Sequence, residues 1–179
     1  MEDRIISFAK LAIGDIAQVG GKNASLGEMF QKLNPLGIRI PGGFAVTAAA
    51  YREFIEQNQL KEFISKQLST LDLVHFSNLR KVSSSIKSKI LKGELPQVLK
   101  EEVLEAYHSL VPDLPNPDVA VRSSATAEDL PGASFAGLHE SFLNIKGKES
   151  LLRAVKSCFA SLYNGRAIKY RHDKGFDKY

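Results

Sequence analysis

Apolar residues recur at helical spacing along most of the chain, and the pattern predicts a largely helical protein. Four of them follow the diglycine at residues 20–21 on one helical face, at positions i, i+3, i+4 and i+7: Leu26, Met29, Phe30 and Leu33. We expect this helix to begin just after the diglycine, with Ser25 and Glu28 as a capping box. A second helix is expected from Ala48 to about Asn58, with Thr47 as its N-cap.

The same helical period continues through residues 60–111, with breaks near Asp72, Gly93 and Pro96. The expected buried stripes of these helices are Ile86, Ile90 and Leu91 in one, and Val98, Leu99, Glu102, Val103 and Ala106 in the next. A last amphipathic helix is expected over 150–171. Its apolar side would comprise Leu151, Leu152, Val155, Phe159, Leu162 and Tyr163.

Short apolar runs between these helices predict strands, because Gly, Pro or polar residues bound each run. The expected strands lie within Arg4–Ile13, at Phe44–Val46, at Val119–Val121 and in the sequence ESFLNIKG, where Phe142 and Ile145 flank Leu143. A connection with three prolines, VPDLPNPDVA, leads into the third of these strands.

An arginine follows the Val119–Val121 strand directly, and a long segment of small residues follows the arginine. We expect Arg122 at a strand end that faces a cleft, where its planar guanidinium suits phosphate oxygens. The small residues at 132–137 would let the backbone lie close to a ligand and close over it. The alternative is a surface loop in which Arg122 pairs with Glu128 or Asp129. These two acids could also bind Mg²⁺. Their spacing does not distinguish a metal ligand from a partner of Arg122, so no metal ligand is assigned.

The diglycine turn ends in Lys22, just where the first helix is expected to begin. Unpaired N–H groups and the helix dipole favour an anion at such a point, and a lysine can reach phosphate oxygens. The segment is not a Walker P-loop, because Ile16 stands at the first glycine position and Asn23 replaces the Ser or Thr that holds magnesium. From the chemistry alone, a phosphate site and a plain turn with a solvated Lys22 both remain open.

Composition narrows the possible classes of protein. With 179 residues and 44% hydrophobic content, the chain can bury one substantial core or two small ones. The net charge of +4 admits a polyanionic ligand, but the lysines are scattered, so no nucleic-acid surface is predicted. The single Cys158 excludes an internal disulfide. No apolar run approaches the ~20 residues that cross a bilayer, and the first residues lack a secretion signal, so we expect a cytoplasmic protein without membrane contact.

Three longer stretches resemble a known enzyme family. VGGKNASLGEM, GIRIPGGFAVTAAAYREFI and VAVRSSATAEDLPGASFAGLHESFLNIKG are similar to the N-terminal, nucleotide-binding region of the phosphoenolpyruvate synthase family. This family includes pyruvate phosphate dikinase and rifampicin phosphotransferase. The resemblance covers nearly the whole chain; the third stretch is the most specific part, and the helical segment 60–111 is the least specific.

The resemblance implies an α+β, ATP-grasp-like fold in which two subdomains clamp ATP. Residues 1–179 would form the N-terminal part of this ATP-binding domain, with 60–111 as a helical insertion. In the family, the β-phosphoryl group of ATP passes to a histidine on a swivelling domain, which carries it to a C-terminal barrel. In phosphoenolpyruvate synthase, pyruvate accepts it there and AMP and phosphate are released. The implied partners are therefore ATP, pyruvate and the two later domains of the same polypeptide.

The matching motifs imply four nucleotide-contacting residues. Lys22 in GGKNASLGE matches a phosphate-contacting lysine, and Arg122 in VRSSATAED matches the arginine that holds the triphosphate. Gly137 and Ser141, in FAGLHESF, fall at ATP-contact positions. Many relatives have Thr in place of Ser141, and the hydroxyl is retained. No catalytic residue is assigned within the chain.

The resemblance also implies parts that these 179 residues do not include. The family's second grasp subdomain supplies the Mg²⁺-binding acids and a Gln-x-Arg motif, and the phosphohistidine domain carries its own Gly-rich motif. We therefore expect a truncated chain with negligible phosphotransfer on its own. Two other interpretations stay open: a fragment of a rifampicin phosphotransferase, and a non-catalytic module for nucleotide binding or interaction.

Overall fold

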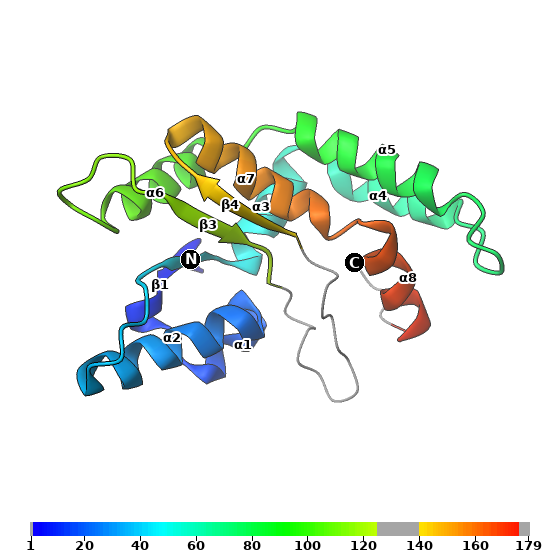
Figure 1. The fold of residues 1–179 in the computed structure, drawn as a ribbon. Coiled ribbons are helices and arrows are strands. Elements are labelled where there is room, and N and C mark those ends of the chain that lie inside the picture. Colours follow the sequence, from blue (N-terminus) through cyan, green and yellow to red (C-terminus); the bar gives the residue numbers. More distant parts are fainter. Residues whose placement is uncertain (1, 125–139, 176–179) are drawn as a thin grey trace.

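The computed structural model describes residues 2–124 and 140–175, which form a mixed α and β fold with helices predominating (Figure 1). The helices and strands are, in chain order, β1 (Ile5–Ser7), α1 (Ile16–Val19), α2 (Gly21–Leu33), β2 (Phe44–Val46), α3 (Ala48–Gln57), α4 (Leu60–Ser69), α5 (Leu79–Lys92), α6 (Gln97–His108), β3 (Val119–Arg122), β4 (Ser141–Ile145), α7 (Lys148–Ser161) and α8 (Gly165–Asp173). Short 3-10 turns lie at Phe8–Lys10, Ile13–Asp15 and Asn34–Leu36. Among the described helices, none combines the length and apolarity needed to span a bilayer.

The first sheet, β1 with β2, separates two hydrophobic cores. Its antiparallel register places Ile5 opposite Val46 and Ile6 opposite Ala45. Because side chains alternate between the faces of a strand, these two pairs point to opposite sides. Ile5 and Val46 pack against the larger core, whereas Ile6 and the buried Ala45 belong to the smaller one. We call β1, β2, α1 and α2 the N-terminal unit, and α3 to α8 with β3 and β4 the helical body.

The helical body is built around large side chains. Phe54 of α3 is fully buried against Phe159 of α7, with ring centroids 5.3 Å apart. The buried hydroxyl of Tyr107 donates to the Pro117 carbonyl at 2.5 Å and accepts from the Gly147 N–H at 3.0 Å. Tyr107 of α6 thus ties together the chain entering β3 and the chain leaving β4, and its polar atom is satisfied inside the core.

The smaller core of the N-terminal unit consists of Leu11, Val19, Ala24 and Ala45. Here α2 approaches the preceding turn without any side chain between them. A Cβ atom placed on Gly27 would lie 2.4 Å from the Leu11 Cβ and 2.7 Å from the Leu11 carbonyl oxygen. Only glycine therefore permits this packing distance.

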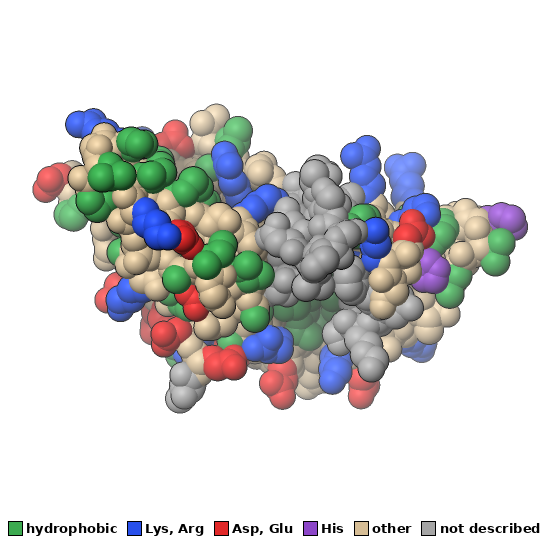
Figure 2. Space-filling model, turned by 90° about the horizontal axis from the view of Figure 1, so that it is seen from below, with side chains coloured by type: hydrophobic (Ala, Val, Ile, Leu, Met, Phe, Trp, Pro, Cys, Tyr) green, Lys and Arg blue, Asp and Glu red, His purple; other side chains and the backbone are tan. Residues whose placement is uncertain are grey.

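The prediction for α2 was correct in its start but wrong in its face and its cap. The buried residues are small ones, Gly21, Ala24 and Gly27, whereas Met29 is 38% exposed. Ser25 lies inside the helix, and the N-cap is Gly20 with φ of 78°, so there is no capping box at Ser25. Figure 2 shows hydrophobic side chains on the surface over the α1–α2 part of the molecule.

The helix expected over 150–171 is two helices. Asn164 interrupts it between α7 and α8, with φ of −59° and ψ of 144°, and is the N-cap residue of α8. The predicted apolar side is largely confirmed, since Leu151, Val155, Phe159 and Tyr163 are buried.

In the 60–111 segment the helices and their breaks are confirmed, as is the burial of Ile86, Ile90, Leu99 and Val103, whereas Glu102 and Ala106 are half-buried. Leu91 and Val98 are exceptions, because 41% and 48% of their surfaces are exposed. Each is next in sequence to a fully buried residue: Leu91 follows Ile90, and Val98 precedes Leu99.

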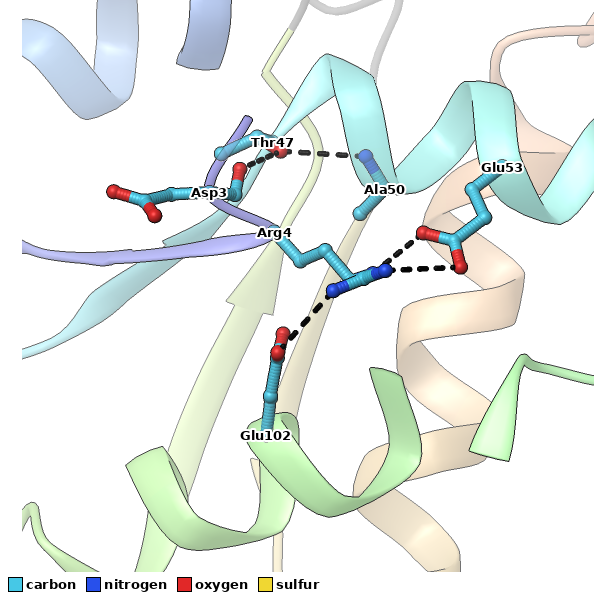
Figure 3. Close-up of polar contacts among 6 residues, drawn as sticks. All are labelled: Asp3, Arg4, Thr47, Ala50, Glu53 and Glu102. Atoms are coloured by element: carbon cyan, nitrogen blue, oxygen red, sulfur yellow. Dashed lines mark hydrogen bonds and ion pairs between the residues drawn. The ribbon is translucent and has the colours of Figure 1, made fainter. Parts of the chain in front are cut away.

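A polar cluster joins the N-terminal unit to the helical body (Figure 3). Arg4, just before β1, donates two hydrogen bonds to the Glu53 carboxylate of α3 and one to Glu102 of α6 at 3.4 Å. Thr47 donates to the Asp3 carbonyl at 2.8 Å and, as predicted, caps α3 by accepting from the Ala50 N–H at 3.3 Å. The position of Glu102 in an otherwise apolar stripe is explained by its pairing with Arg4.

Candidate functional site

A cleft of about 1970 Å³ is lined by residues of both the N-terminal unit and the helical body. The N-terminal unit contributes residues 41–46 and the α1–α2 junction. The helical body contributes the end of β3 and faces of α3 and α7. In Figure 1, α7 runs along one side of β3 and β4, and α1 and α2 lie on the other side. The end of β3 therefore borders the cleft.

The strand β3 runs along this cleft and ends in Arg122. Val119 and Val121 are half-buried and pack against the larger core, while Ala120 and Arg122 are exposed. Arg122 is the last residue of the strand and lines the cleft. Arg122 therefore lies at a strand end facing a cleft, as expected.

Ser141 lies directly opposite Arg122 in the antiparallel β3–β4 ladder, so two predicted site residues are cross-strand neighbours. The ladder has an irregularity one step further along. Two residues of β4, Leu143 and Asn144, stand opposite one residue of β3, and Asn144 has φ of 55°. With this bulge, Phe142 and Ile145 are both half-buried, Ile145 packs against the larger core, and Leu143 is 59% exposed.

Two serines follow Arg122 and line the same cleft. Ser123 is only 6% exposed, and its N–H donates to the Glu140 carbonyl at 3.2 Å. Its Oγ and the buried Oγ of Ser124 have no hydrogen-bond partner in the described part of the chain. A buried hydroxyl left unpaired costs ~1–3 kcal/mol, so these two groups are suited to a ligand with acceptor or donor atoms.

Lys22 is the second residue of α2 and is exposed. Its neighbours Val19 and Asn23 line the cleft, although Lys22 itself is not among the lining residues. The side-chain amide of Asn23 donates to the Val19 carbonyl at 2.8 Å, which fixes the turn between α1 and α2 around Gly20. The structure thus brings the first turn of α2 to the cleft that Arg122 lines.

The fourth predicted residue, Gly137, lies outside the described residues, as do Glu128 and Asp129, the alternative partners of Arg122. Within 2–124 and 140–175, no three His, Cys, Asp or Glu side chains gather into a group that could hold a metal ion. The described groups at the end of β3 are a guanidinium and hydroxyls, which suit phosphate oxygens.

A different part of the cleft is aromatic, and sequence reasoning missed it. The hydroxyls of Tyr51 and Tyr163 are 2.9 Å apart, and the Arg171 guanidinium lies over the Tyr163 ring at 5.6 Å. Burial, followed by the contact with Tyr163, raises the pKa of Tyr51 well above its ordinary value. The helical period assigned Tyr163 to the core, and nothing in that period could show that the core side of α7 also borders a cleft.

Cys158 also lines the cleft, but its chemistry is suppressed. Burial and, second, the charge of Glu140 raise the pKa of its thiol to about 12. The thiolate is the reactive form, so Cys158 is expected to be inert near neutral pH. It is a small, half-buried side chain in the described structure.

Comparison with known proteins identifies the class of this domain. Residues 16–179 match the family model described as the pyruvate phosphate dikinase, AMP/ATP-binding domain. The chain therefore belongs to this family of nucleotide-binding domains.

Its relatives carry a more specific name. The chain is 49% identical, over 99% of its length, to the phosphoenolpyruvate synthase of Pseudomonas aeruginosa (strain UCBPP-PA14). It is 49% identical over 98% of its length to that of Neisseria meningitidis serogroup B (strain MC58), and 43% identical over 97% to that of Escherichia coli (strain K12). The chain spans 22% of the length of each of these relatives.

Proposed function

We propose that this chain is the nucleotide-binding part of a phosphoenolpyruvate synthase, a pyruvate, water dikinase. The complete enzyme would convert ATP, pyruvate and water to AMP, phosphoenolpyruvate and phosphate through a phosphohistidine. The observation that carries the proposal is that Arg122, which pairs across the ladder with Ser141, lines a large cleft in an AMP/ATP-binding domain. The identity to enzymes named phosphoenolpyruvate synthase supports the particular reaction.

In this proposal the chain is the N-terminal subdomain of an ATP-grasp-like fold, and its cations hold the triphosphate. The Arg122 guanidinium would form paired hydrogen bonds to phosphate oxygens, and Ser141, its neighbour on β4, would add a hydroxyl. Lys22 and the N-terminus of α2 would add positive charge from the other side of the cleft. Gly137 is proposed as a further nucleotide contact. Fixed positive groups of this kind stabilise the charge that spreads over the phosphoryl oxygens during transfer.

Mg²⁺ is proposed to accompany ATP, where it would neutralise phosphate charge. The described groups at the end of β3 are a guanidinium and hydroxyls. The resemblance to the family implies that the acidic ligands lie outside this chain, and they are proposed there. Pyruvate, the swivelling phosphohistidine domain and the C-terminal barrel are likewise proposed as parts of the complete reaction. A cytoplasmic location is proposed with them.

The proposal is tested by expressing the complete open reading frame and measuring AMP formed from ATP. We expect AMP to form only when pyruvate is present, with phosphoenolpyruvate in equal amount. Rifampicin in place of pyruvate is the second arm, and turnover with it would identify a rifampicin phosphotransferase instead. No AMP with either acceptor, but measurable ATP binding, would indicate a non-catalytic module. The 179-residue chain alone is expected to show negligible turnover in the same assay.

The role of Arg122 is tested by Arg122→Ala in the complete enzyme. Losing a charge-assisted phosphate contact costs ~1.5–3 kcal/mol or more, so kcat/KM for ATP should fall by about 10- to 150-fold. The unfolding midpoint should stay unchanged because Arg122 is exposed. Arg39→Ala is the matched control, since Arg39 is exposed and does not line the cleft. Unfolding by Arg122→Ala with nucleotide affinity retained would assign the arginine a structural role.

A further inference from the structure

Three polar side chains from segments far apart in the sequence meet near the end of β3. The Lys87 ammonium of α5 donates to the Asn164 side-chain oxygen at 2.6 Å. The Asn164 amide nitrogen donates to the Glu140 carboxylate at 3.0 Å, and Lys87 approaches the same carboxylate oxygen at 3.4 Å. The three groups form a closed triangle of donors and acceptors. We call it the Lys87–Asn164–Glu140 triad.

The backbone of Glu140 connects this triad to the candidate site. The Glu140 carbonyl accepts the Ser123 N–H at 3.2 Å, which extends the β3–β4 ladder by one step beyond the pair Arg122 and Ser141. Glu140 is therefore held twice, by its side chain to two helices and by its main chain to the strand end that carries Arg122. No member of the triad lines the cleft.

Asn164 is itself fixed, so the triad rests on a firm support. Its N–H donates to the Ser161 carbonyl at 3.0 Å and its carbonyl accepts the Ile168 N–H at 2.9 Å, at the break between α7 and α8. The adjoining Tyr163 carbonyl accepts the buried Ser83 hydroxyl of α5 at 2.7 Å. Two helices are thus locked together at the point where Asn164 reaches toward Glu140.

We infer that the Lys87–Asn164–Glu140 triad positions Arg122 and Ser141 for nucleotide binding, by fixing the residue just before β4 to α5 and to the break between α7 and α8. The inference rests on the proposed function for its link to ATP. Its physical basis is that phosphate contacts depend on the placement of the strand end within a fraction of an ångström. The three residues are positioning residues, since none of them lines the cleft that would hold the nucleotide.

The decisive variant is Asn164→Asp in the complete enzyme, because it preserves shape while reversing one hydrogen bond. The donor that faces Glu140 becomes a carboxylate oxygen, and two carboxylates then repel each other. We expect KM for ATP to rise about tenfold, with kcat and KM for pyruvate changed less than about twofold. Glu140→Gln alone should have little effect, because the amide oxygen can still accept from both partners.

Rescue by the double variant separates this role from general damage. In Asn164→Asp/Glu140→Gln, the glutamine amide donates to the aspartate and Lys87 pairs with the aspartate, so both hydrogen bonds of residue 164 are restored, with donor and acceptor exchanged between residues 164 and 140. KM for ATP should return to within about twofold of the wild-type value. Lys87→Met should raise KM for ATP, whereas Lys81→Met is the matched control, because Lys81 is an exposed lysine of the same helix.

A second measurement does not depend on turnover. In the described structure the Ser123 N–H is protected by the Glu140 carbonyl, so amide hydrogen exchange at Ser123 should quicken in Asn164→Asp and recover in the double variant. Unchanged exchange and unchanged KM for ATP in Asn164→Asp would overturn the inference. If the wild-type enzyme formed no AMP, the proposed function would fail, and ATP affinity from equilibrium dialysis would replace KM in the same comparison. Failure of rescue would also count against the triad.

Discussion

Arg122 and Lys22 belong to two parts of the molecule that are packed in different ways. Arg122 ends a strand that lies against α7 and the larger core, where the rings of Phe54, Tyr107 and Phe159 fill the interior. Lys22 is in the first turn of a helix that sits on a small core and touches Leu11 through the bare backbone of Gly27. The stability of the helical body should therefore fall most when side-chain atoms are removed. The stability of the N-terminal unit should fall most when atoms are added.

The difference bears on the proposed site, since the two cations would have to reach the same polyphosphate. Each is held by its own core, and the two units meet through the β1–β2 sheet, the Arg4 cluster and a contact between α1 and α3. A change in one core should therefore displace one cation and leave the other in place. This independence can be tested separately on each side.

The largest expected effect is in the helical body, for Phe54→Ala. Phe54 is fully buried and packs against Phe159, so the variant loses the transfer free energy of the ring and leaves a cavity. We expect the free energy of unfolding to fall by ~3–5 kcal/mol, measured by guanidinium denaturation. Leu143→Ala is the control and should change it by less than ~0.5 kcal/mol, because Leu143 is largely exposed. Equal losses in the two variants would contradict a core dominated by large rings.

The next effect is in the N-terminal unit, for Gly27→Ala. In an open helix this change would stabilise by ~1 kcal/mol through helix propensity. Here the new Cβ would lie 2.4 Å from the Leu11 Cβ and 2.7 Å from its carbonyl oxygen, so we expect a net loss of ~1–3 kcal/mol. Trimming Leu11 to Ala should not relieve this loss, because both contacted atoms remain.

Gly14→Ala is the matched control for this prediction. A Cβ on Gly14 would meet nothing within 4 Å, so its substitution should leave the free energy of unfolding nearly unchanged. The comparison between the two glycines depends on the sign of the change in the free energy of unfolding. A gain of stability in Gly27→Ala would show that α2 does not depend on close backbone packing.

The same contrast explains which parts of the fold could be predicted from the sequence. In the helical body, large apolar residues such as Leu99 and Val103 recur at helical period and are buried as expected. In α2, hydrophobicity marks the wrong face, because the buried residues are glycine and alanine, while Met29 faces solvent. Apolar periodicity predicts packing between large side chains. It does not detect close packing at glycine and alanine.

The candidate site shows a similar limit. The position of Arg122 at a strand end followed from local pattern, because three apolar residues precede it. Its pairing with Ser141 is a register between two strands, next to a bulge at Asn144 that the apolar pattern of residues 141–145 does not reveal. The break at Asn164 was missed because the apolar period runs through it without interruption, up to the buried Tyr163.

The smallest expected effect concerns a loop of the helical body that begins with the polar contacts of Asp72. The Asp72 carboxylate accepts from the N–H groups of Val74 and His75, each at 3.1 Å, and from the Ser77 N–H at 3.3 Å and hydroxyl at 2.6 Å. The Ser77 hydroxyl, followed by the backbone N–H of His75, lowers the pKa of Asp72 from 3.8 to about 2. The ionised form is therefore favoured in the folded state.

The pH dependence of stability follows from this shift. Because the folded pKa lies below the unfolded value, the contribution of Asp72 is fully present above about pH 4 and is lost as the pH falls through about 2. Asp72→Asn should lower the unfolding midpoint at neutral pH by less than Gly27→Ala does, and should flatten its decline between about pH 4 and 2. Asp113→Asn is the control, since Asp113 is an exposed acid in another loop. If the decline were as steep in Asp72→Asn as in the wild type, the carboxylate contacts would not stabilise the loop.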